Sequence, residues 1–235
     1  MIDETNPLKV YTRENSLKWE QKSELDKPRQ YILDRVIELS RVGGTTLLDI
    51  GCGTGRWTRK FAEHLENVVG LDASPEMIKI AKEKNPAENI EYFEGDILSS
   101  YEGKYDIVTC LAMLHCTKDR KELNRLYEQV IKHTKRFSSF LFYVPHPMAV
   151  FTNLSRTAHS EFDSDMCYQD NFPYTTTIQL GNGETRQGEG YHHTIEEYVR
   201  DLTEHGFVIW DMKEISVKND KIPFALVVDG FRLKE

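Results

Sequence analysis

The chain has 235 residues, of which 39% are hydrophobic, and this is enough to bury one sizeable core in an α/β domain. No apolar run approaches the ~20 residues that a membrane helix requires, and the first residues lack the pattern of a secretory signal. Four cysteines without a CxxC pair indicate reduced thiols and argue against zinc. We therefore expect a cytoplasmic protein with no membrane segment and no metal, and the net charge of −8 disfavours nucleic acid as a partner.

The first 26 residues are polar with scattered aromatic side chains, among them Tyr11 and Trp19. They fit a short helix that covers a ligand crevice, and equally one that packs on the body for stability. A longer helix is predicted to begin at Asp26, whose side chain can cap it. That helix should end at the glycine pair 43–44.

Residues 47–57, LLDIGCGTGRW, join an apolar strand to a predicted helix through alternating glycines. Glycine suits a turn whose backbone takes positive φ or comes within contact distance of a ligand. Asp49 stands at the carboxyl end of the strand, where open α/β sheets hold their ligands. The spacing differs from the dinucleotide fingerprint, because Arg56 stands where the last small residue belongs, and the Gly-Lys-Ser/Thr of a P-loop is absent.

The Asp-x-Gly-x-Gly-x-Gly pattern, here Asp49, Gly51, Gly53 and Gly55, resembles motif I of class I S-adenosylmethionine-dependent methyltransferases. The resemblance implies S-adenosylmethionine as the cofactor, with Cys52 also in its site. It also implies an α/β fold with a Rossmann-like, seven-stranded, mostly parallel sheet of order 3-2-1-4-5-7-6, in which strand 7 is antiparallel and helices cover both faces. A glycine-rich turn in another kind of nucleotide-binding protein is the alternative.

A second buried strand, residues 67–72, ends in Asp72, about 20 residues after the first strand. A carboxylate only accepts hydrogen bonds, so Asp72 can receive both hydroxyls of a ribose. Its alternative role is to cap the helix predicted at 75–84. Within the resemblance, Asp72 and the adjacent Ala73 belong to the cofactor site.

A third strand at 90–93 runs into Gly95, Asp96 and Ile97. This segment resembles the one that meets the adenine in the family, so Asp96 would accept a hydrogen bond from the exocyclic amine and Ile97 would pack on the ring. In the same family the N-terminal segment often closes on the cofactor. The resemblance therefore adds Tyr11 to the cofactor contacts.

A fourth apolar strand, residues 105–110, is headed by Asp106, for which we predict a structural role in a turn. The strand and the loop after it resemble the fourth motif of the family. The resemblance implies that the backbone of Cys110 and Leu111 passes the methionine part of the cofactor. It also implies that His115 points toward the methyl group.

Residues 145–192, after a fifth predicted strand, form an insertion that is richer in Thr, Asn, Tyr and His than the core. Within it, Asn182-Gly183 separates strand-like runs at 174–180 and 184–189, which predicts a β-hairpin. We expect this hairpin to arch over the crevice as a substrate lid. The acidic residues at 161–170 match no metal-binding spacing, and we interpret them as a solvated loop.

Thr194 and Glu197 form a capping-box pattern for a helix at 194–205. Two strands follow, at 207–217 and 223–228. They are expected to form the antiparallel hairpin that distinguishes methyltransferase sheets from dinucleotide-binding ones.

S-adenosylmethionine carries an activated methyl group, so the protein must hold the acceptor in line with it and keep water out. A hydroxyl or ammonium acceptor also needs a base, and histidine titrates near neutrality. His146 and His192 are the first catalytic candidates, because they resemble histidines that border the acceptor site of small-molecule methyltransferases, and His115 is the third. Each also has a purely structural interpretation, and a carboxyl acceptor needs no base.

We therefore predict a methyltransferase that acts on O or N of a small or medium organic acceptor, secondary or natural-product metabolites included. Two alternatives stay open. An RNA-modifying methyltransferase of the same fold would show a contiguous basic face, and a partner subunit would bind the cofactor without catalysis. The chain, residues 1–235, is expected to form one domain, with residues 1–26 covering the cofactor, and to act as a monomer or homodimer.

Overall fold

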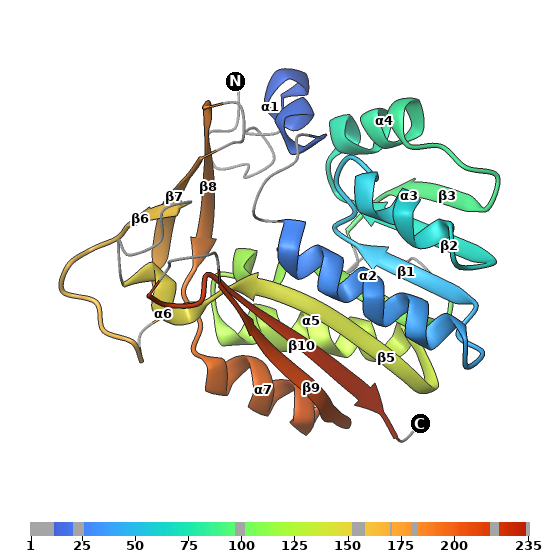
Figure 1. The fold of residues 1–235 in the computed structure, drawn as a ribbon. Coiled ribbons are helices and arrows are strands. Elements are labelled where there is room, and N and C mark those ends of the chain that lie inside the picture. The colour runs from blue at the N-terminus through green and yellow to red at the C-terminus, as the bar shows by residue number, and fades with distance from the viewer. Residues whose placement is uncertain are drawn as a thin grey trace.

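The computed structural model describes residues 12–20, 26–96, 102–151, 158–169, 171–179, 183–216 and 221–233. They form two β-sheets with helices packed around the larger one (Figure 1). Within this part of the chain no helix has the length and apolar character needed to cross a membrane.

The large sheet has seven strands in the order β3-β2-β1-β4-β5-β10-β9. Strands β1 to β5 pair in parallel, whereas β10 is antiparallel to both of its neighbours. The predicted order 3-2-1-4-5-7-6 is thus confirmed. Here β10 is the predicted antiparallel strand 7, and β9 is the predicted strand 6. The strands are β1 (Thr46–Ile50), β2 (Asn67–Asp72), β3 (Ile90–Glu94), β4 (Tyr105–Leu111), β5 (Thr134–Pro145), β9 (Phe207–Ile215) and β10 (Ala225–Arg232).

Helices cover both faces of this sheet, because successive side chains of each central strand point to opposite sides. On β1, Leu47 packs in the core beneath α2 and α3, whereas Leu48 packs in the core beneath α5 and α7. Figure 1 shows these two helical layers, with α4 beyond α3 at the β2–β3 end of the sheet. The helices are α2 (Asp26–Ser40), α3 (Arg56–Ala62), α4 (Pro75–Lys84), α5 (Arg120–His133) and α7 (Ile195–Glu204).

The helix ends use the signals present in the sequence. Gly43, with φ of 105°, follows the end of α2. Ser74 is the N-cap of α4 and Asp119 that of α5. Thr194 and Glu197 form the predicted capping box at the start of α7. The capping hydrogen bonds fix where α4, α5 and α7 begin, and so they set the ends of the loops that connect the strands to these helices.

The insertion carries a short helix, α6 (Pro147–Val150), and a second, antiparallel sheet of order β6-β7-β8. The predicted hairpin is confirmed as β7 (Pro173–Gln179) and β8 (Thr185–Tyr191). The outer strand β6 (Ala158–Glu161) was not predicted. Near the N-terminus lie a short helix, α1 (Arg13–Leu17), and a 3-10 turn, η2 (Lys18–Glu20).

Candidate active site

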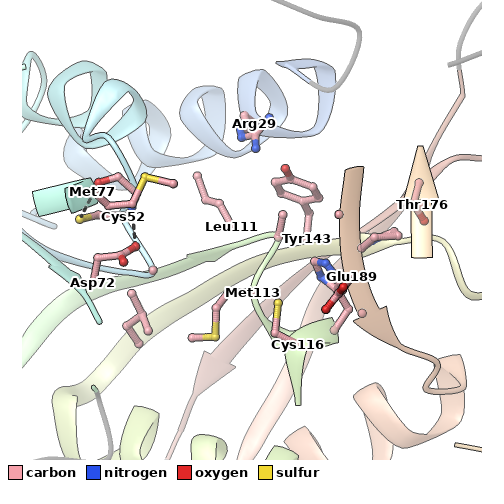
Figure 2. Close-up of a pocket in the computed structure, with 18 of the residues that line it drawn as sticks. Arg29, Cys52, Asp72, Met77, Leu111, Met113, Cys116, Tyr143, Thr176 and Glu189 are labelled. Atoms are coloured by element: carbon pink, nitrogen blue, oxygen red, sulfur yellow. Dashed lines mark hydrogen bonds between the residues drawn. The ribbon is translucent and has the colours of Figure 1, made fainter. Parts of the chain in front are cut away.

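A cavity of about 860 Å³ begins at the carboxyl ends of β1, β2 and β4 and extends to the small sheet (Figure 2). Its wall has two parts. The glycine end is lined by Asp49, Gly51, Gly53 and Asp72, and the small-sheet end by His115, Tyr174, Thr176 and Gly188. Tyr174, Thr176 and Gly188 lie more than 100 residues further along the chain than Asp72, and the cavity brings them together with the glycine turn.

The turn after β1 has a backbone that glycine adopts easily. Gly51 and Gly53 have φ of 69° and 57°, in the left-handed region that L side chains seldom adopt. The amides of Gly51 and Cys52 donate to the carbonyl of Leu71, at 2.8 and 3.1 Å, which ties the turn to β2. A Cβ on Gly53 would meet nothing nearer than Met77 Sδ at 4.0 Å. The main chain at Gly53 is therefore bare toward the cavity.

Gly55 serves packing instead. It has φ of 77° and does not line the cavity. A Cβ there would lie 2.5 Å from the hydroxyl of Tyr92, and one on Gly70 would lie 2.7 Å from the same ring. Glycine is needed here because a tyrosine ring fills the space, and the predicted contact of Gly55 with the cofactor stays a prediction.

Cys110 lies just outside the cavity wall, and the predicted role of its backbone beside the methionine part of the cofactor stays a prediction. Its side chain is fully buried in the core beneath α5 and α7. Burial raises the pKa of its thiol well above the ordinary value. The next residue, Leu111, does line the cavity.

Asp72 is held at the cavity by backbone amides. The amide of Gly53 donates to Asp72 Oδ2 at 2.8 Å, and the amide of Ser74 donates to Oδ1 at 2.9 Å. Burial raises the pKa of this carboxyl, and the two hydrogen bonds oppose that rise. Ser74, and not Asp72, caps α4. Each carboxylate oxygen keeps a further lone pair, so both can accept from a ligand.

Asp49, the last polar residue of β1 before the turn, is buried beneath the cavity. Its oxygens accept hydrogen bonds from Thr58 Oγ1 at 2.6 Å and Thr109 Oγ1 at 2.8 Å. Burial raises its pKa to about 6, against the lowering effect of these bonds. The side chain is 1% exposed, so the carboxyl mainly joins β1 to α3 and β4 beneath the cavity.

The remaining predicted cofactor residues divide into two groups. Cys52, Ala73, Gly95 and Asp96 all line the cavity, beside the glycine end. Tyr11 and Ile97 lie outside the described residues, and their roles stay predictions.

His115 is the one of the three candidate histidines that lines the cavity. It lies in a 3-10 turn, η3 (Leu114–Cys116), after β4. Among the described residues its buried Nδ1 has no hydrogen-bond partner. Burial lowers its pKa to about 4, with a smaller contribution from His193. At neutral pH the ring is therefore an uncharged imidazole in the cavity wall.

The other two histidines, His146 and His192, do not line the cavity, and a catalytic role for either stays a prediction. His146 caps α6: its Nδ1 accepts from the amide of Met148 at 3.2 Å, and its Nε2 lies 3.0 Å from Glu214 Oε1. His192 stacks on Phe172, with ring centroids 4.9 Å apart and planes at 8°, and meets the ring of Phe151 edge-on. Both rings hold the insertion in place.

Several residues of the cavity wall were not predicted. Figure 2 shows Arg29 above Tyr143, and the guanidinium lies 5.2 Å from the ring centroid. Arg29 follows a proline in the first turn of α2, a position that carries no functional signal of its own. Gly188 and Gly190 could have been noticed, since glycine inside a strand indicates a close approach by a ligand or another part of the chain.

Comparison with known proteins agrees with this geometry. Residues 47–136 match the family model described as a methyltransferase domain. A methyltransferase homologue from Geobacillus sp. (strain WCH70) is 25% identical over 207 residues, covering 80% of this chain and 83% of that protein. The ubiquinone biosynthesis O-methyltransferase of Erwinia tasmaniensis is 30% identical over 94 residues, which span 38% of this chain and 39% of the relative.

Solved structures share the fold. The sugar N-methyltransferase KedS8 of Streptoalloteichus sp. superposes with a TM-score of 0.66 at 17% identity, covering 90% of this chain and 89% of the other. The bare glycine turn, the amide-held Asp72 and the cavity between them fit a nucleoside cofactor. The chain belongs to the class I S-adenosylmethionine-dependent methyltransferases, with S-adenosylmethionine as its cofactor.

Proposed function

We propose that this methyltransferase acts on an oxygen or nitrogen of a small or medium organic acceptor, secondary and natural-product metabolites included. The observation that carries the proposal is the continuous cavity of about 860 Å³ that joins the glycine end to the small-sheet end. Its size lies within the ~300–1,000 Å³ typical of small-ligand sites. One chamber can therefore hold the cofactor and a small acceptor together.

The glycine end is proposed to hold the cofactor. Asp72 would accept from the ribose hydroxyls, since its two oxygens are fixed by backbone amides and keep lone pairs toward the cavity. The backbone of Gly51 to Gly53 and of Leu111 would lie against the methionine part. Gly95 and Asp96 would contact the adenine. When bound, the cofactor supplies a methyl group on a positively charged sulfur.

The small-sheet end is proposed to hold the acceptor, with residues 145–192 as its lid. His115 would receive the proton of a hydroxyl or ammonium acceptor, because its ring is neutral and lies in this wall. The insertion would also exclude water, which competes for the acceptor position. Residues 1–26 would close the other side, and Lys18 of that segment already lines the cavity.

The relatives support the acceptor class. One is an O-methyltransferase of ubiquinone biosynthesis and a structural neighbour is a sugar N-methyltransferase. Both names describe transfer to small organic molecules, at the two kinds of atom proposed here.

Calorimetry followed by an acceptor screen tests the proposal. S-adenosylmethionine and its demethylated product should bind with micromolar affinity, and NAD should not bind. Tritiated cofactor should then label members of a panel of hydroxyl- and amine-bearing small molecules, and leave bulk tRNA unlabelled. Labelling of tRNA alone would favour the RNA-modifying alternative, and cofactor binding without any labelling would favour a non-catalytic partner subunit.

A further inference from the structure

Two glycines of β8, Gly188 and Gly190, stand two residues apart and so face the same side of the small sheet. A Cβ on Gly190 would lie 2.7 Å from His115 Cδ2 and 2.9 Å from the ring of Tyr174. Both of those side chains line the cavity. The face of β8 that carries the two glycines therefore looks into the cavity.

The two glycines differ in what lies opposite them. Gly190 is needed for space, because His115 and Tyr174 already occupy the position of its missing side chain. A Cβ on Gly188, by contrast, would have no atom within 4 Å. The φ of Gly188 also lies outside the left-handed region, so its backbone would accept any L residue. Neither packing nor backbone geometry requires glycine at position 188.

Polar groups border this bare position. Thr176 pairs with Gly188 across β7 and β8, and Ser160 pairs with Thr176 across β6 and β7. The hydroxyls of Ser160 and Thr176 lie 3.0 Å apart, and both residues line the cavity. One hydroxyl can donate to the other while the second donates to a ligand. The strand face thus offers a flat backbone surface beside a pair of hydroxyls.

We propose that Gly188 is the residue that determines acceptor specificity, by leaving room for a ring that lies flat on β8. The acceptor would be a ring compound bearing hydroxyl or amino groups, such as a sugar or a polyhydroxylated cyclic amine. The Ser160–Thr176 pair would hold one polar substituent, and His115, which lies in the same cavity wall, would lie beside the atom that is methylated. This inference rests on the proposed function, since it names the acceptor class of the same site.

Gly188→Ala and Gly188→Val test the proposal with three amine probes of increasing size: ethanolamine, trans-4-aminocyclohexanol and glucosamine. Added methyl groups in a filled site typically cost 1–3 kcal/mol, which is about 10–100-fold in affinity. We expect the preference for the ring amines over ethanolamine, as kcat/KM, to fall at least ~10-fold in the valine variant. The Kd of glucosamine for the complex with S-adenosylhomocysteine should rise by a similar factor, and the Kd of S-adenosylhomocysteine itself should not change.

Stability separates this role from a structural one. Alanine stabilises a strand relative to glycine, so Gly188→Ala should have an equal or higher Tm, by about 1–3 °C. Thr177→Val is the matched control, because Thr177 lies on the same strand pair but outside the cavity wall. It should keep the ring preference of the wild type.

The outcomes are distinct. An unchanged ring preference and glucosamine Kd in both Gly188 variants would overturn the inference while leaving the small-molecule function intact. A lower Tm with equal losses on all probes would assign Gly188 to packing and also overturn it. Binding of S-adenosylhomocysteine without binding or methylation of any probe would count against the proposed function and this inference together.

Discussion

The two ends of the cavity are built in different ways. At the glycine end the main chain forms the surface, with Gly51 and Gly53 at positive φ and Asp72 held by backbone amides. At the small-sheet end side chains such as His115 and Tyr174 form most of it, beside the bare backbone of Gly188. A main-chain site needs particular residue types at particular spacings. A side-chain site needs only the correct face of a strand or turn, and many residue types satisfy that condition.

The ends also differ in charge. Asp49 and Asp72 are buried carboxyls at the glycine end, and burial raises the pKa of both. His115 at the other end is neutral because burial lowers its pKa to about 4. In the proposed function a cationic cofactor would have two carboxyls beside it at the glycine end, and an uncharged imidazole would stand where an acceptor loses its proton. The predictions below test each half of this contrast.

The largest effect is expected from His115→Ala. Loss of a general base typically costs 10²–10⁴-fold, or about 3–5 kcal/mol. We expect kcat on a hydroxyl or amine acceptor to fall at least ~100-fold, with the Kd of S-adenosylmethionine unchanged. Steady-state kinetics and calorimetry measure the two quantities.

His146→Gln is the control for this prediction. His146 is buried but caps α6, outside the cavity wall. Its replacement should lower the free energy of unfolding by about 1 kcal/mol, the typical contribution of a cap, and leave kcat within a factor of about two. A larger loss of kcat in His146→Gln than in His115→Ala would instead identify His146 as the base.

The second effect separates two glycines of the turn. Gly55→Ala should lower the free energy of unfolding by about 2–4 kcal/mol, since it adds a clash with Tyr92 to the strain of positive φ. Gly53→Ala has the strain without the clash, and about 1–2 kcal/mol is expected. Urea unfolding measures both. Equal losses would mean that the Tyr92 contact contributes little.

The third effect tests the ribose assignment. Asp72→Ala should weaken binding of S-adenosylmethionine by about 1–3 kcal/mol, or roughly 10–100-fold, because it leaves the ribose hydroxyls and the amides of Gly53 and Ser74 without their acceptor. Asp72→Asn, which keeps one acceptor oxygen, should lose less. Wild-type affinity in the alanine variant would refute the assignment.

The last effect concerns pH. In the folded chain the pKa of His115 is about 4, against 6.5 for an ordinary histidine. Between these values the unfolded chain holds the extra proton, so the contribution of His115 to stability is present above pH 6.5 and is lost as pH falls toward 4. His115→Asn should lose less unfolding free energy than the wild type across this window. If the unfolding free energies of the wild type and the variant fall in parallel with pH, the imidazole of the folded chain titrates normally.

The sequence predicted the glycine end well, because its signals are local. Motif spacing located Asp49 and Asp72, and the structure places both on the cavity. Gly55 fits the same motif, yet its neighbour is Tyr92, which is 37 residues away and reaches the turn only in the folded sheet. Motif spacing therefore could not separate a glycine that faces a ligand from one that faces a side chain.

The small-sheet end was predicted only in outline. The Asn-Gly turn predicted the hairpin, but β6 was missed because it joins the sheet across a long loop. The sequence also could not show which of the three histidines would line the cavity. A histidine ring can cap a helix, stack on another ring or line a cavity. The position of His146 depends on its contact with Glu214, which is 68 residues away in the chain, and that of His192 on its stacking with Phe172.

The ring of Tyr92 links two glycines that are otherwise unrelated in the chain, Gly55 and Gly70. A smaller residue at position 92 would remove the tyrosine clash at positions 55 and 70, and the strain of positive φ would remain at 55. Protein engineering of this turn, and natural divergence within the family, should therefore change position 92 before or together with position 70. A library that randomises positions 70 and 92 together would sample these combinations directly.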